Sequence, residues 1–306
     1  MNPRYHHSIF IPCYNRGAVL NKTLQSVANL DYLDFEVIII NDGSRDNTDE
    51  IAQQWISKKL FSIQYFTQSN QGKHVAHNKA VSLARGYFFI TLDAGDFILK
   101  DALSQIDKYW SDINEGLREK FAGVSGLCLS ESGEISGFRY PEEIIDSNYF
   151  DIFRVVPIGG EKREAIITSI LKDYLFPVYG NEKLIRPDLI LRQISRKYKF
   201  RFINVPLEVN VREANGYTAN IYRFRVTSPR SFYHYFREEI NENYQYNRNK
   251  KIFYYYTRYI RYALHCRINL FSQSGEVKNK LLWLAALPSG VLGWIKDVIQ
   301  KKNMAI

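Results

Sequence analysis

The stretch YFFITLDAGDFIL, residues 87–99, joins an apolar run to two carboxylates, Asp93 and Asp96. The run predicts a buried strand, because aromatic, β-branched and aliphatic residues follow one another without a break. Ionised carboxylates are rarely buried without hydrogen-bond donors or a cation. We therefore expect this strand to end at water, at a positive group or at a metal ion.

Three earlier apolar segments are also expected to be strands. They are SIFIP at 8–12, FEVIIIND at 35–42 and IQYFTQ at 63–68, and helix-like stretches at 18–30, 47–59 and 75–84 separate the four strands. Alternation of strand and helix at this spacing predicts a parallel sheet with right-handed crossovers. The expected fold class is α/β, with a mostly parallel sheet flanked by helices on both faces.

Polar residues follow each of these strands. They lie at 12–15, 41–43, 68–73 and 93–96. In open α/β sheets, ligands bind outside the carboxyl ends of the strands, so we expect these four segments to line one crevice. The acidic residues from Asp46 to Glu50 are assigned instead to the start of the second helix, whose amino end favours negative charge.

The order of elements is harder to predict after residue 100. We expect a strand at 121–130, a short helix at 163–174, an amphipathic helix at 188–198 and one or two strands at 199–211. From about Tyr217 the composition shifts to tyrosine, arginine and asparagine, and helices are expected. The predicted organisation is a first domain over 1–216 and a basic, Tyr-rich helical extension over 217–306.

Charge and cysteine content restrict the cell compartment and the partners. The 306 residues carry a net charge of +9 and three scattered cysteines. Unpaired cysteines indicate a reducing compartment, and the first residues lack the apolar core of a secretory signal, so a cytoplasmic location is expected. The positive charge implies an anionic partner. No nucleic-acid-binding signature is present, so nucleic acid is not expected to be that partner.

The last part of the chain, KNKLLWLAALPSGVLGWIKDVIQKK, holds an apolar run from Leu281 to Ile295 that is interrupted by Pro-Ser-Gly at 288–290. We expect it to be too short and too interrupted to span a bilayer. Its flanking lysines and two tryptophans are typical of a segment that lies in a membrane interface, here at the inner face of the cell membrane. A C-terminal helical hairpin packed on the protein is an equal alternative.

Three stretches together carry a family resemblance. They are SIFIPCYNRGAVLNKTLQSV, EVIIINDGSRDNTDEI and NQGKHVAHNKAVSLARGYFFITLDAGD. They resemble the nucleotide-sugar domain of family 2 glycosyltransferases, which has the inverting, Rossmann-like GT-A fold. The resemblance implies transfer of a sugar from a nucleotide-diphosphate donor, most often a UDP-sugar, to a glycan or lipid-linked acceptor in surface polysaccharide synthesis. The lack of a multi-span apolar region favours a non-processive enzyme.

The resemblance also assigns the donor site. It implies that Pro12, Tyr14 and Asn15 line the pocket for the base, and that Asp42 accepts hydrogen bonds from the base or ribose. Lys73 follows a glycine at the start of a helix, where a cation and free N–H groups could meet a diphosphate or ribose. A solvated surface lysine is an equal alternative for Lys73.

Asp93 and Asp96 match the first and last acids of the Asp-x-Asp-Asp element that, in the family, holds a divalent ion on the donor diphosphate. Mg²⁺ or Mn²⁺ suits such oxygen ligands. Gly95 stands where the family has the middle acid, which is usually credited with the metal contact. Either Asp96 takes over this contact, with the glycine giving the backbone room, or dependence on metal is weak.

An inverting transfer also needs a general base for the acceptor hydroxyl. The closest match to the family's element is YGNEKLIRPDLILRQISRKY, so Glu182 is the predicted base and Asp188 ranks second, as an acid that starts a helix after proline. Weaker similarity implies that Glu161 or Arg163 contacts the acceptor or diphosphate. It also implies that Arg212 and Arg223 lie in a loop that closes over the donor.

Two other assignments stay open. The first concerns His74 and His77, which are spaced for a shared metal but lack a third ligand nearby and are expected to be structural. The second concerns the class of protein. A sugar nucleotidyltransferase should carry a Gly-rich phosphate loop, which IPCYNRGAV does not provide. A catalytically silent nucleotide- or sugar-binding module is the non-enzyme alternative, and Gly95 motivates it.

Overall fold

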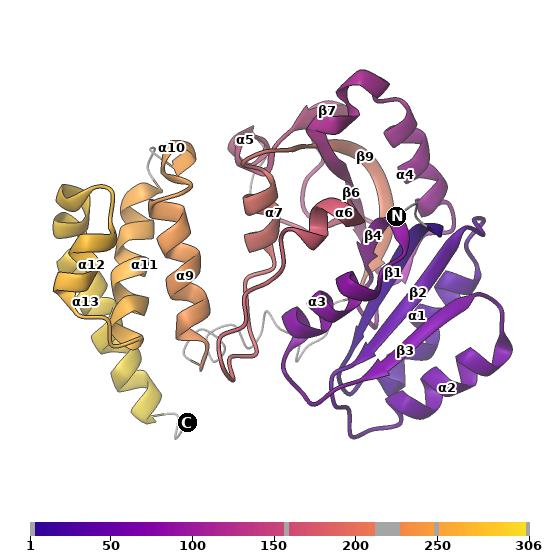
Figure 1. Cartoon of the computed structure of the whole chain (residues 1–306), viewed down its shortest axis with the longest axis horizontal. Helices are drawn as coiled ribbons and strands as arrows, with labels where there is room; N and C mark the ends of the chain where they lie inside the picture. The colour runs from indigo at the N-terminus through magenta and orange to yellow at the C-terminus, as the bar shows by residue number, and fades with distance from the viewer. Residues whose placement is uncertain (1–3, 156–158, 212–226, 248–250, 304–306) are drawn as a thin grey trace. The chain divides into compact units, whose positions relative to one another are not determined.

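The computed structural model describes residues 4–155, 159–211, 227–247 and 251–303. It divides into two compact units (Figure 1). Unit 1 comprises Met1–Phe176 and Ile190–Glu213, and unit 2 comprises Pro177–Leu189 and Ala214–Ile306. The domain boundary predicted at 216/217 lies outside the described residues. Residues 177–189, assigned to the first domain by sequence, cluster with unit 2.

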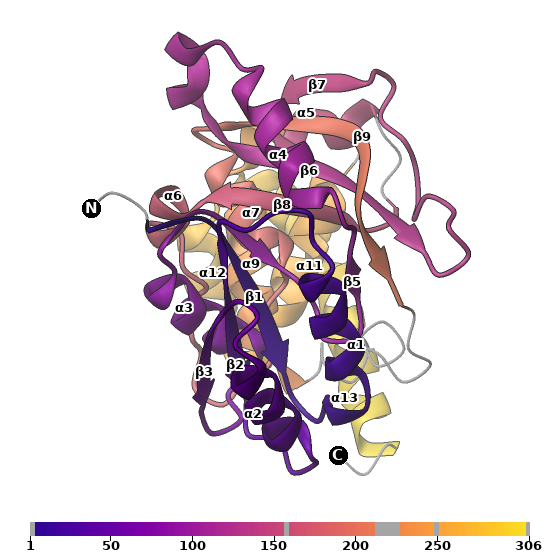
Figure 2. The same cartoon turned by 90° about the vertical axis from the view of Figure 1, so that its right-hand side faces the viewer.

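Unit 1 is built on a nine-stranded sheet with the order β3-β2-β1-β4-β8-β6-β9-β5, and β7 pairs with β9 (Figure 2). Its strands are β1 (Tyr5–Cys13), β2 (Phe35–Asn41), β3 (Ser62–Thr67), β4 (Gly86–Thr91), β5 (Phe97–Ile98), β6 (Phe121–Ser130), β7 (Ile144–Ser147), β8 (Lys162–Ile167) and β9 (Lys199–Asn210). Its helices are α1 (Gly17–Ala28), α2 (Thr48–Lys58), α3 (Lys73–Leu83), α4 (Ala102–Ser111), the 3-10 helix η1 (Glu115–Lys120), α5 (Tyr149–Val155) and α6 (Thr168–Lys172). The helix α7 (Asp188–Ile194) begins in unit 2 and ends in unit 1.

The first four strands confirm the sequence prediction. β2 and β4 each lie parallel to β1, and β3 lies parallel to β2. Every residue of β2 is buried, as a strand covered on both faces requires. Alternate residues of β1 face opposite layers: Ile9 and Ile11 pack with α1, α2 and α4, whereas Phe10 packs with α3, α6 and α7. The core therefore consists of two apolar layers, one on each face of the sheet.

The second half of the sheet is mixed rather than mostly parallel. β8 runs antiparallel to both β4 and β6, and β5 and β7 run antiparallel to β9. The helix predicted over 163–174 is wrong in its first part, because Lys162–Ile167 forms the strand β8 and only Thr168–Lys172 is helical. The hydrogen-bond partners that β4 and β6 offer on both sides outweigh the local helix preference of this segment.

Unit 2 is helical. It contains α9 (Pro229–Ile240), α10 (Tyr244–Asn247), α11 (Ile252–His265), α12 (Leu270–Glu276) and α13 (Lys280–Asn303). α9 and α13 both pack against α11, and aromatic side chains such as Phe232, Tyr256 and Tyr259 fill the contacts.

The prediction that 288–290 interrupts the last segment is wrong, because α13 continues through Pro288. In the described part of the chain, one helix, Lys280–Gln300, is long and apolar enough to cross a membrane by length and composition.

Candidate active site

The loops that follow β1 and β2 are bonded to each other at the carboxyl edge of the sheet. The side-chain oxygen of Asn15 accepts a hydrogen bond from Arg45 N at 2.8 Å, and Asn15 N donates to Ser44 Oγ at 2.9 Å. Asn15 has a φ of +52°, which asparagine tolerates better than most residues. Tyr14 is exposed, and Pro12 is half-buried near the end of β1. The three predicted base-pocket residues thus lie together at this edge.

Asp46 joins the same two loops. Its carboxylate accepts hydrogen bonds from Gly17 N at 2.9 Å and Thr48 N at 3.1 Å, at the starts of α1 and α2. Burial alone would raise the pKa of Asp46, but the hydrogen bonds from Thr48 and Gly17 outweigh it and lower the pKa. The structural role predicted for this aspartate is therefore confirmed.

Asp42 holds the loop that leads into α3. Its carboxylate accepts hydrogen bonds from Gln68 Nε2 at 2.8 Å, Gln71 N at 2.9 Å and Gly72 N at 2.8 Å. Gly72 has a φ of +96° directly before the helix, a conformation that suits glycine. A carboxylate has about four acceptor sites, so Asp42 keeps acceptor capacity beyond these three bonds.

Lys73 and Asp93 connect the loops after β3 and β4. Lys73 is the first residue of α3, as expected, and its Nζ lies 2.5 Å from Asp93 Oδ1 and 2.7 Å from Oδ2. Burial alone would raise the pKa of Asp93, but the positive charges of Lys73 and Arg163 outweigh it and lower the pKa. Both partners remain partly exposed, 53% for the Lys73 side chain and 39% for that of Asp93. The pair is therefore open to a ligand from solvent.

Asp96 closes the turn that begins at Asp93. Asp96 N donates to Asp93 O at 2.9 Å, and Gly95 between them has a φ of +119°, which side-chain-bearing residues rarely adopt. Thr23 of α1 secures the turn, because its Oγ1 accepts from Gly95 N and donates to Asp96 O. The backbone path of this turn explains a glycine at position 95.

The Asp96 carboxylate belongs to a buried polar network that the sequence did not reveal. Its oxygens accept hydrogen bonds from Val211 N at 2.8 Å and Asn210 Nδ2 at 2.9 Å. Asn210 Nδ2 also lies 3.0 Å from Glu208 Oε1, and Glu208 forms an ion pair with Arg163. Burial raises the pKa of Asp96 and that of Glu208. A charged residue amid apolar neighbours in the segment PLEVNV was the available signal for Glu208.

The chemistry of the donor set fits a divalent cation at the turn 93–96. Asp93 and Asp96 offer only carboxylate oxygens, which Mg²⁺ and Mn²⁺ prefer, and such ions complete their shell with phosphate oxygens and water. The ammonium of Lys73 now balances Asp93. A cation at Asp93 would therefore compete with Lys73 for the same oxygens.

Glu182, the predicted base, lies in unit 2. Its two carboxylate oxygens accept hydrogen bonds from Arg230 N and Ser231 N, both at 2.8 Å. These N–H groups belong to the first turn of α9, which has no intrahelical acceptor for them. Burial raises the pKa of Glu182, and the two backbone hydrogen bonds oppose this shift. The carboxylate thus caps α9, and its predicted catalytic role stays a prediction.

The structure also places Asp188 and His77. Asp188 starts α7, as expected, and pairs with Arg186 and Tyr235. His77 is buried against the rings of Phe10, Phe89 and Phe176, and burial lowers its pKa to about 3, which confirms a structural residue. Arg212 and Arg223 lie outside the described residues.

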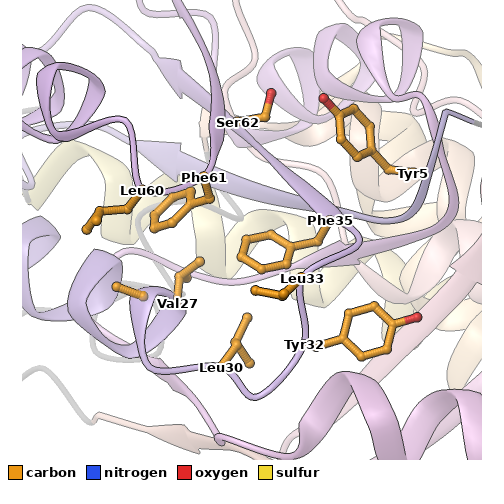
Figure 3. A pocket seen from close by; sticks show the side chains of 10 residues that line it. Tyr5, Val27, Leu30, Tyr32, Leu33, Phe35, Leu60, Phe61 and Ser62 are labelled. Atoms are coloured by element: carbon orange, nitrogen blue, oxygen red, sulfur yellow. The ribbon is translucent and has the colours of Figure 1, made fainter.

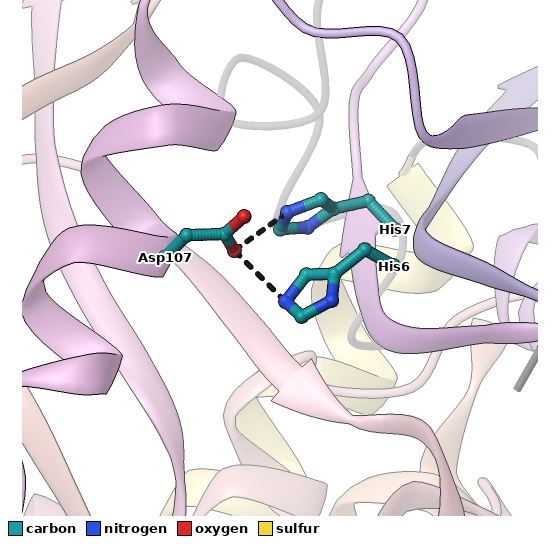
Figure 4. A group of neighbouring side chains, drawn as sticks. All are labelled: His6, His7 and Asp107. Atoms are coloured by element: carbon teal, nitrogen blue, oxygen red, sulfur yellow. Dashed lines mark hydrogen bonds and ion pairs between the residues drawn. The ribbon is translucent and has the colours of Figure 1, made fainter.

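The opposite edge of the sheet holds two other features. A hollow of about 400 Å³, lined mostly by aliphatic and aromatic residues, lies where β1, β2 and β3 begin (Figure 3). Nearby, Nε2 of both His6 and His7 lies within 3.0 Å of Asp107 Oδ1 (Figure 4). Among the described residues, these three side chains form the one group whose potential ligand atoms lie close enough together to hold a metal ion. Tyr32 OH also donates to Asp107, so this carboxylate already joins β1, α4 and the loop before β2 by hydrogen bonds.

Part of this chain matches a known protein family. Residues 8–117, which contain the four parallel strands and the turn 93–96, match the model of glycosyl transferase family 2. This part of the chain is therefore similar to glycosyl transferases of family 2.

Two curated relatives and two solved structures illustrate the likeness. The chain is 32% identical over 186 residues to a Campylobacter jejuni GalNAc(5)-diNAcBac-PP-undecaprenol beta-1,3-glucosyltransferase, covering 57% of this chain and 56% of the relative. It is 30% identical over 131 residues to the poly(ribitol-phosphate) beta-N-acetylglucosaminyltransferase TarS of Staphylococcus aureus, covering 41% of this chain and 22% of TarS. The alignments therefore span about half of one relative's length and a fifth of the other's.

The solved structures share the fold. S. aureus TarS 1-349 in complex with UDP-GlcNAc superposes with a TM-score of 0.59 and 15% identity, covering 98% of this chain and 92% of that chain. A mannosyltransferase from Pyrobaculum calidifontis in complex with GDP-Man and Mn²⁺ gives a TM-score of 0.56 at 15% identity, covering 98% and 88%. At this identity the likeness shows the fold, which is the GT-A fold of glycosyltransferases.

Proposed function

We propose that this chain is an inverting, non-processive glycosyltransferase. It transfers a sugar from a nucleoside-diphosphate donor, with UDP as the expected nucleotide, to a glycan or lipid-linked acceptor in surface polysaccharide synthesis. The observation that carries the proposal is the partly exposed Lys73–Asp93 pair, with Asp96 beside it, at the carboxyl edge of four parallel strands in a chain similar to family 2 glycosyl transferases. Ligands bind at this edge in open α/β sheets.

The donor nucleoside is proposed to lie over the loops after β1 and β2. The exposed ring of Tyr14 offers an apolar face for the base, and Pro12 and Asn15 border the same space. Asp42 keeps the loop 68–72 in place through its three hydrogen bonds, and its remaining acceptor capacity would take a hydroxyl or N–H of the nucleoside. Rigid loops lower the entropy cost of binding a flexible donor.

The diphosphate is proposed to lie beside Lys73. The Lys73 ammonium would turn from Asp93 to a phosphate oxygen, and the positive amino end of α3 would add to the attraction. Asp93 and Asp96 would hold a divalent cation, which, when bound, offsets the negative charge that builds up on the departing diphosphate. The pair Arg163–Glu208 and the amide of Asn210 keep Asp96 in its orientation.

Glu182 is proposed as the general base. Its pKa is raised by burial, and a raised pKa makes a carboxylate a better proton acceptor near neutral pH. Each of its oxygens retains acceptor capacity beyond the bond to α9. In the proposed reaction Glu182 takes the proton of the acceptor hydroxyl, whose oxygen then attacks the anomeric carbon from the face opposite the diphosphate. Asp188 is the second candidate.

The named relatives support this choice of substrates. One is named as a glucosyltransferase of an undecaprenol-linked glycan, and TarS was solved with UDP-GlcNAc. The mannosyltransferase was solved with GDP-Man and Mn²⁺, so a guanine nucleotide is the alternative donor to test. A lipid-linked acceptor would fit a cytoplasmic protein that works at the inner face of the cell membrane.

Thermal unfolding with UDP, GDP and dTDP, each with and without Mn²⁺, tests the donor site. A ligand at 100 times its dissociation constant stabilises the folded state by roughly 2.7 kcal/mol, which is a measurable shift. We expect one nucleotide to raise the unfolding temperature, and Mn²⁺ to increase the shift in the wild type but not in Asp93→Asn. No shift with any nucleotide would contradict the proposal.

Gly95 motivates one alternative, a nucleotide-sugar-binding module without catalysis. A transferase and a binding module would both show a rise in unfolding temperature with the nucleotide, so a second measurement is needed to distinguish them. A transferase is expected to hydrolyse slowly the sugar conjugate of the nucleotide that stabilises it. With Mn²⁺ present, this hydrolysis can be measured as release of free nucleotide. A protein that binds the donor and releases no nucleotide, with or without added glycan acceptors, would favour the module.

A further inference from the structure

The helix α13 exposes an apolar face along almost its whole length. Exposed residues recur at alternating intervals of four and three residues, which keeps them on one side of a helix. They are Leu281, Ala285, Pro288, Leu292, Ile295 and Ile299, with Leu284 alongside. The exposed fractions of Leu281 and Leu292 are 81% and 66%. We call this set the α13 stripe.

The buried residues of α13 are Trp283, two small residues and one charged residue. Ala286 and Gly290 are buried, and a Cβ at Gly290 would lie 2.6 Å from Ile260 Cγ2 of α11. Gly290 therefore allows a close approach of the two helices. Asp297 is also buried and binds Arg261 and His265 of α11. Turning α13 to bury its leucines would break this ion pair and drive side chains into α11.

A helix on a soluble protein usually exposes its polar face, whereas α13 exposes a line of leucine and isoleucine side chains. From Leu281 to Ile299 the stripe is roughly 27 Å long at 1.5 Å per residue. Contiguous exposed apolar surface of this kind marks a site of contact with a membrane or another protein. The stripe is thus a built feature of unit 2, because α11 fixes the face that α13 presents.

The charges beside the stripe favour an anionic lipid surface. Lys278, Lys280 and Lys296 are exposed, whereas Asp297, the sole acid from residue 277 onward, is buried in its ion pair. Pairing of the stripe with that of a second copy would bring lysines of like charge together. Anionic headgroups attract lysines at the same depth at which apolar side chains enter the acyl boundary.

We propose that α13 docks unit 2 onto an anionic membrane surface, with the α13 stripe in the interfacial layer. The helix lies along the surface rather than across the bilayer, because its other face is committed to α11. This inference rests on the proposed function only in naming the surface at which a lipid-linked acceptor would be met. The contact itself needs neither donor nor acceptor.

Co-sedimentation of the full chain with vesicles tests the proposal without any sugar substrate. We expect binding to vesicles of phosphatidylcholine with roughly one quarter phosphatidylglycerol, and much weaker binding to phosphatidylcholine alone. The variant Leu284→Gln/Leu292→Gln/Ile299→Gln should lower the partition coefficient at least about tenfold, because each buried aliphatic side chain contributes to the partition. All three side chains are exposed, so folding should be unaffected.

Two control variants sharpen the result. Leu33→Gln changes a side chain of unit 1 that is 93% exposed, and it should bind vesicles like the wild type. Lys280→Gln/Lys296→Gln should lose roughly tenfold in binding to the anionic vesicles, since each lysine near the surface contributes. It should change binding to the neutral vesicles little.

Two outcomes would overturn the proposal. The first is a failure in the vesicle assay: either the wild-type chain does not sediment with anionic vesicles, or the stripe variant sediments to the same extent as the wild type. The second is a wild-type dimer, measured by light scattering, that dissociates in the stripe variant while neither form binds vesicles, which would assign the stripe to a second copy. Either result would leave the transferase proposal intact, because nucleotide binding is measured separately.

Discussion

The two edges of the unit 1 sheet both gather ionisable side chains, but the side chains are held differently. At the amino edge, two histidines and Tyr32 converge on Asp107, and His7 is fully buried. At the carboxyl edge, Lys73 and Asp93 are paired yet both partly exposed. The first cluster fastens β1 to α4, whereas the second can exchange a partner for a ligand.

The comparison shows that close ligand atoms alone are a poor sign of function. The amino-edge group meets the distance condition for a metal site, and it sits where the strands begin. Asp93 and Asp96 at the carboxyl edge offer two ligands rather than three, but they lie where ligands bind in this fold class. We therefore expect changes at the carboxyl edge to affect turnover and changes at the amino edge to affect stability.

Glu182 extends this comparison to unit 2, because its carboxylate caps α9 and is also the proposed base. Glu182→Gln keeps an acceptor for α9 but removes the base, so turnover should fall on the order of a hundredfold or more. Nucleotide affinity should change little. Steady-state kinetics and thermal unfolding measure the two effects, with the exposed Glu242→Gln as the control. Unchanged turnover with a lowered unfolding temperature would leave Glu182 as a cap only.

Asp93→Asn should weaken donor binding. It removes the charge that balances Lys73 and would hold a cation, and a bond to a charged group contributes about 1.5–3 kcal/mol, which is roughly ten- to a hundredfold in affinity. Titration calorimetry with the stabilising nucleotide and Mn²⁺ checks this. Asp31→Asn, at an exposed site, should bind like the wild type. Equal affinity in both variants would remove Asp93 from the site.

Asp107→Ala should act on stability alone. The buried His7 would lose its charged acceptor, and an unsatisfied buried donor costs about 1–3 kcal/mol. Denaturant unfolding should show this loss in the free energy of unfolding, whereas turnover per folded molecule should match the wild type. Asp112→Ala, exposed at the end of the same helix, serves as the control. A large loss of turnover without a loss of stability would reverse the contrast between the edges.

The smallest effect is a pH dependence at the amino edge. The hydrogen bond that His6 donates to Asp107 raises the pKa of His6, with burial opposing, so protonated His6 stabilises the folded state below its ordinary pKa of about 6.5. This contribution is lost as pH rises through the raised value. The difference in unfolding free energy between wild type and His6→Ala should therefore shrink above about pH 6.5. We expect a difference of less than about 1 kcal/mol, because the His6–Asp107 pair is partly exposed. A difference that does not change with pH would contradict this prediction.

The pH dependence of His6→Ala isolates one group among several. Burial lowers the pKa of the neighbouring His7, so its contribution has the opposite sign and is lost as pH falls. His7 remains in both proteins, and its contribution cancels in the difference apart from its coupling to His6. Asp107 stays ionised throughout, because its pKa is held well below the usual value.

The sequence predicted the parallel half of the sheet because each of those strands is a near-continuous apolar run. β2, buried at every residue, is the clearest case. β8 was missed because its partners are distant in sequence: Ala165 lies opposite Ile90 of β4 and Val124 of β6. A local pattern does not reveal hydrogen bonds to strands some 40 and 75 residues away, so REAII read as helix.

The candidate site divides in the same way. Asp42, Lys73 and Asp93 follow strands in ordered motifs, and their position at one edge follows from parallel topology. Glu208 and Asn210 come to Asp96 only because β9 pairs with β5 and β6, which no motif near residue 208 announces. The face that α13 exposes was equally hidden, because it depends on which side packs against α11.

The turn at Gly95 bears on how this chain could be redesigned. The glycine in place of the family's middle acid looks like a single substitution. A side chain at this position would, however, have to adopt a φ of +119°, which costs about 1–3 kcal/mol of stability. Thr23, fully buried, bonds to both Gly95 N and Asp96 O and so ties the turn to α1. Restoring the acid would therefore require rebuilding the loop together with its anchor, so the departure from the family pattern is not reversible in one mutational step.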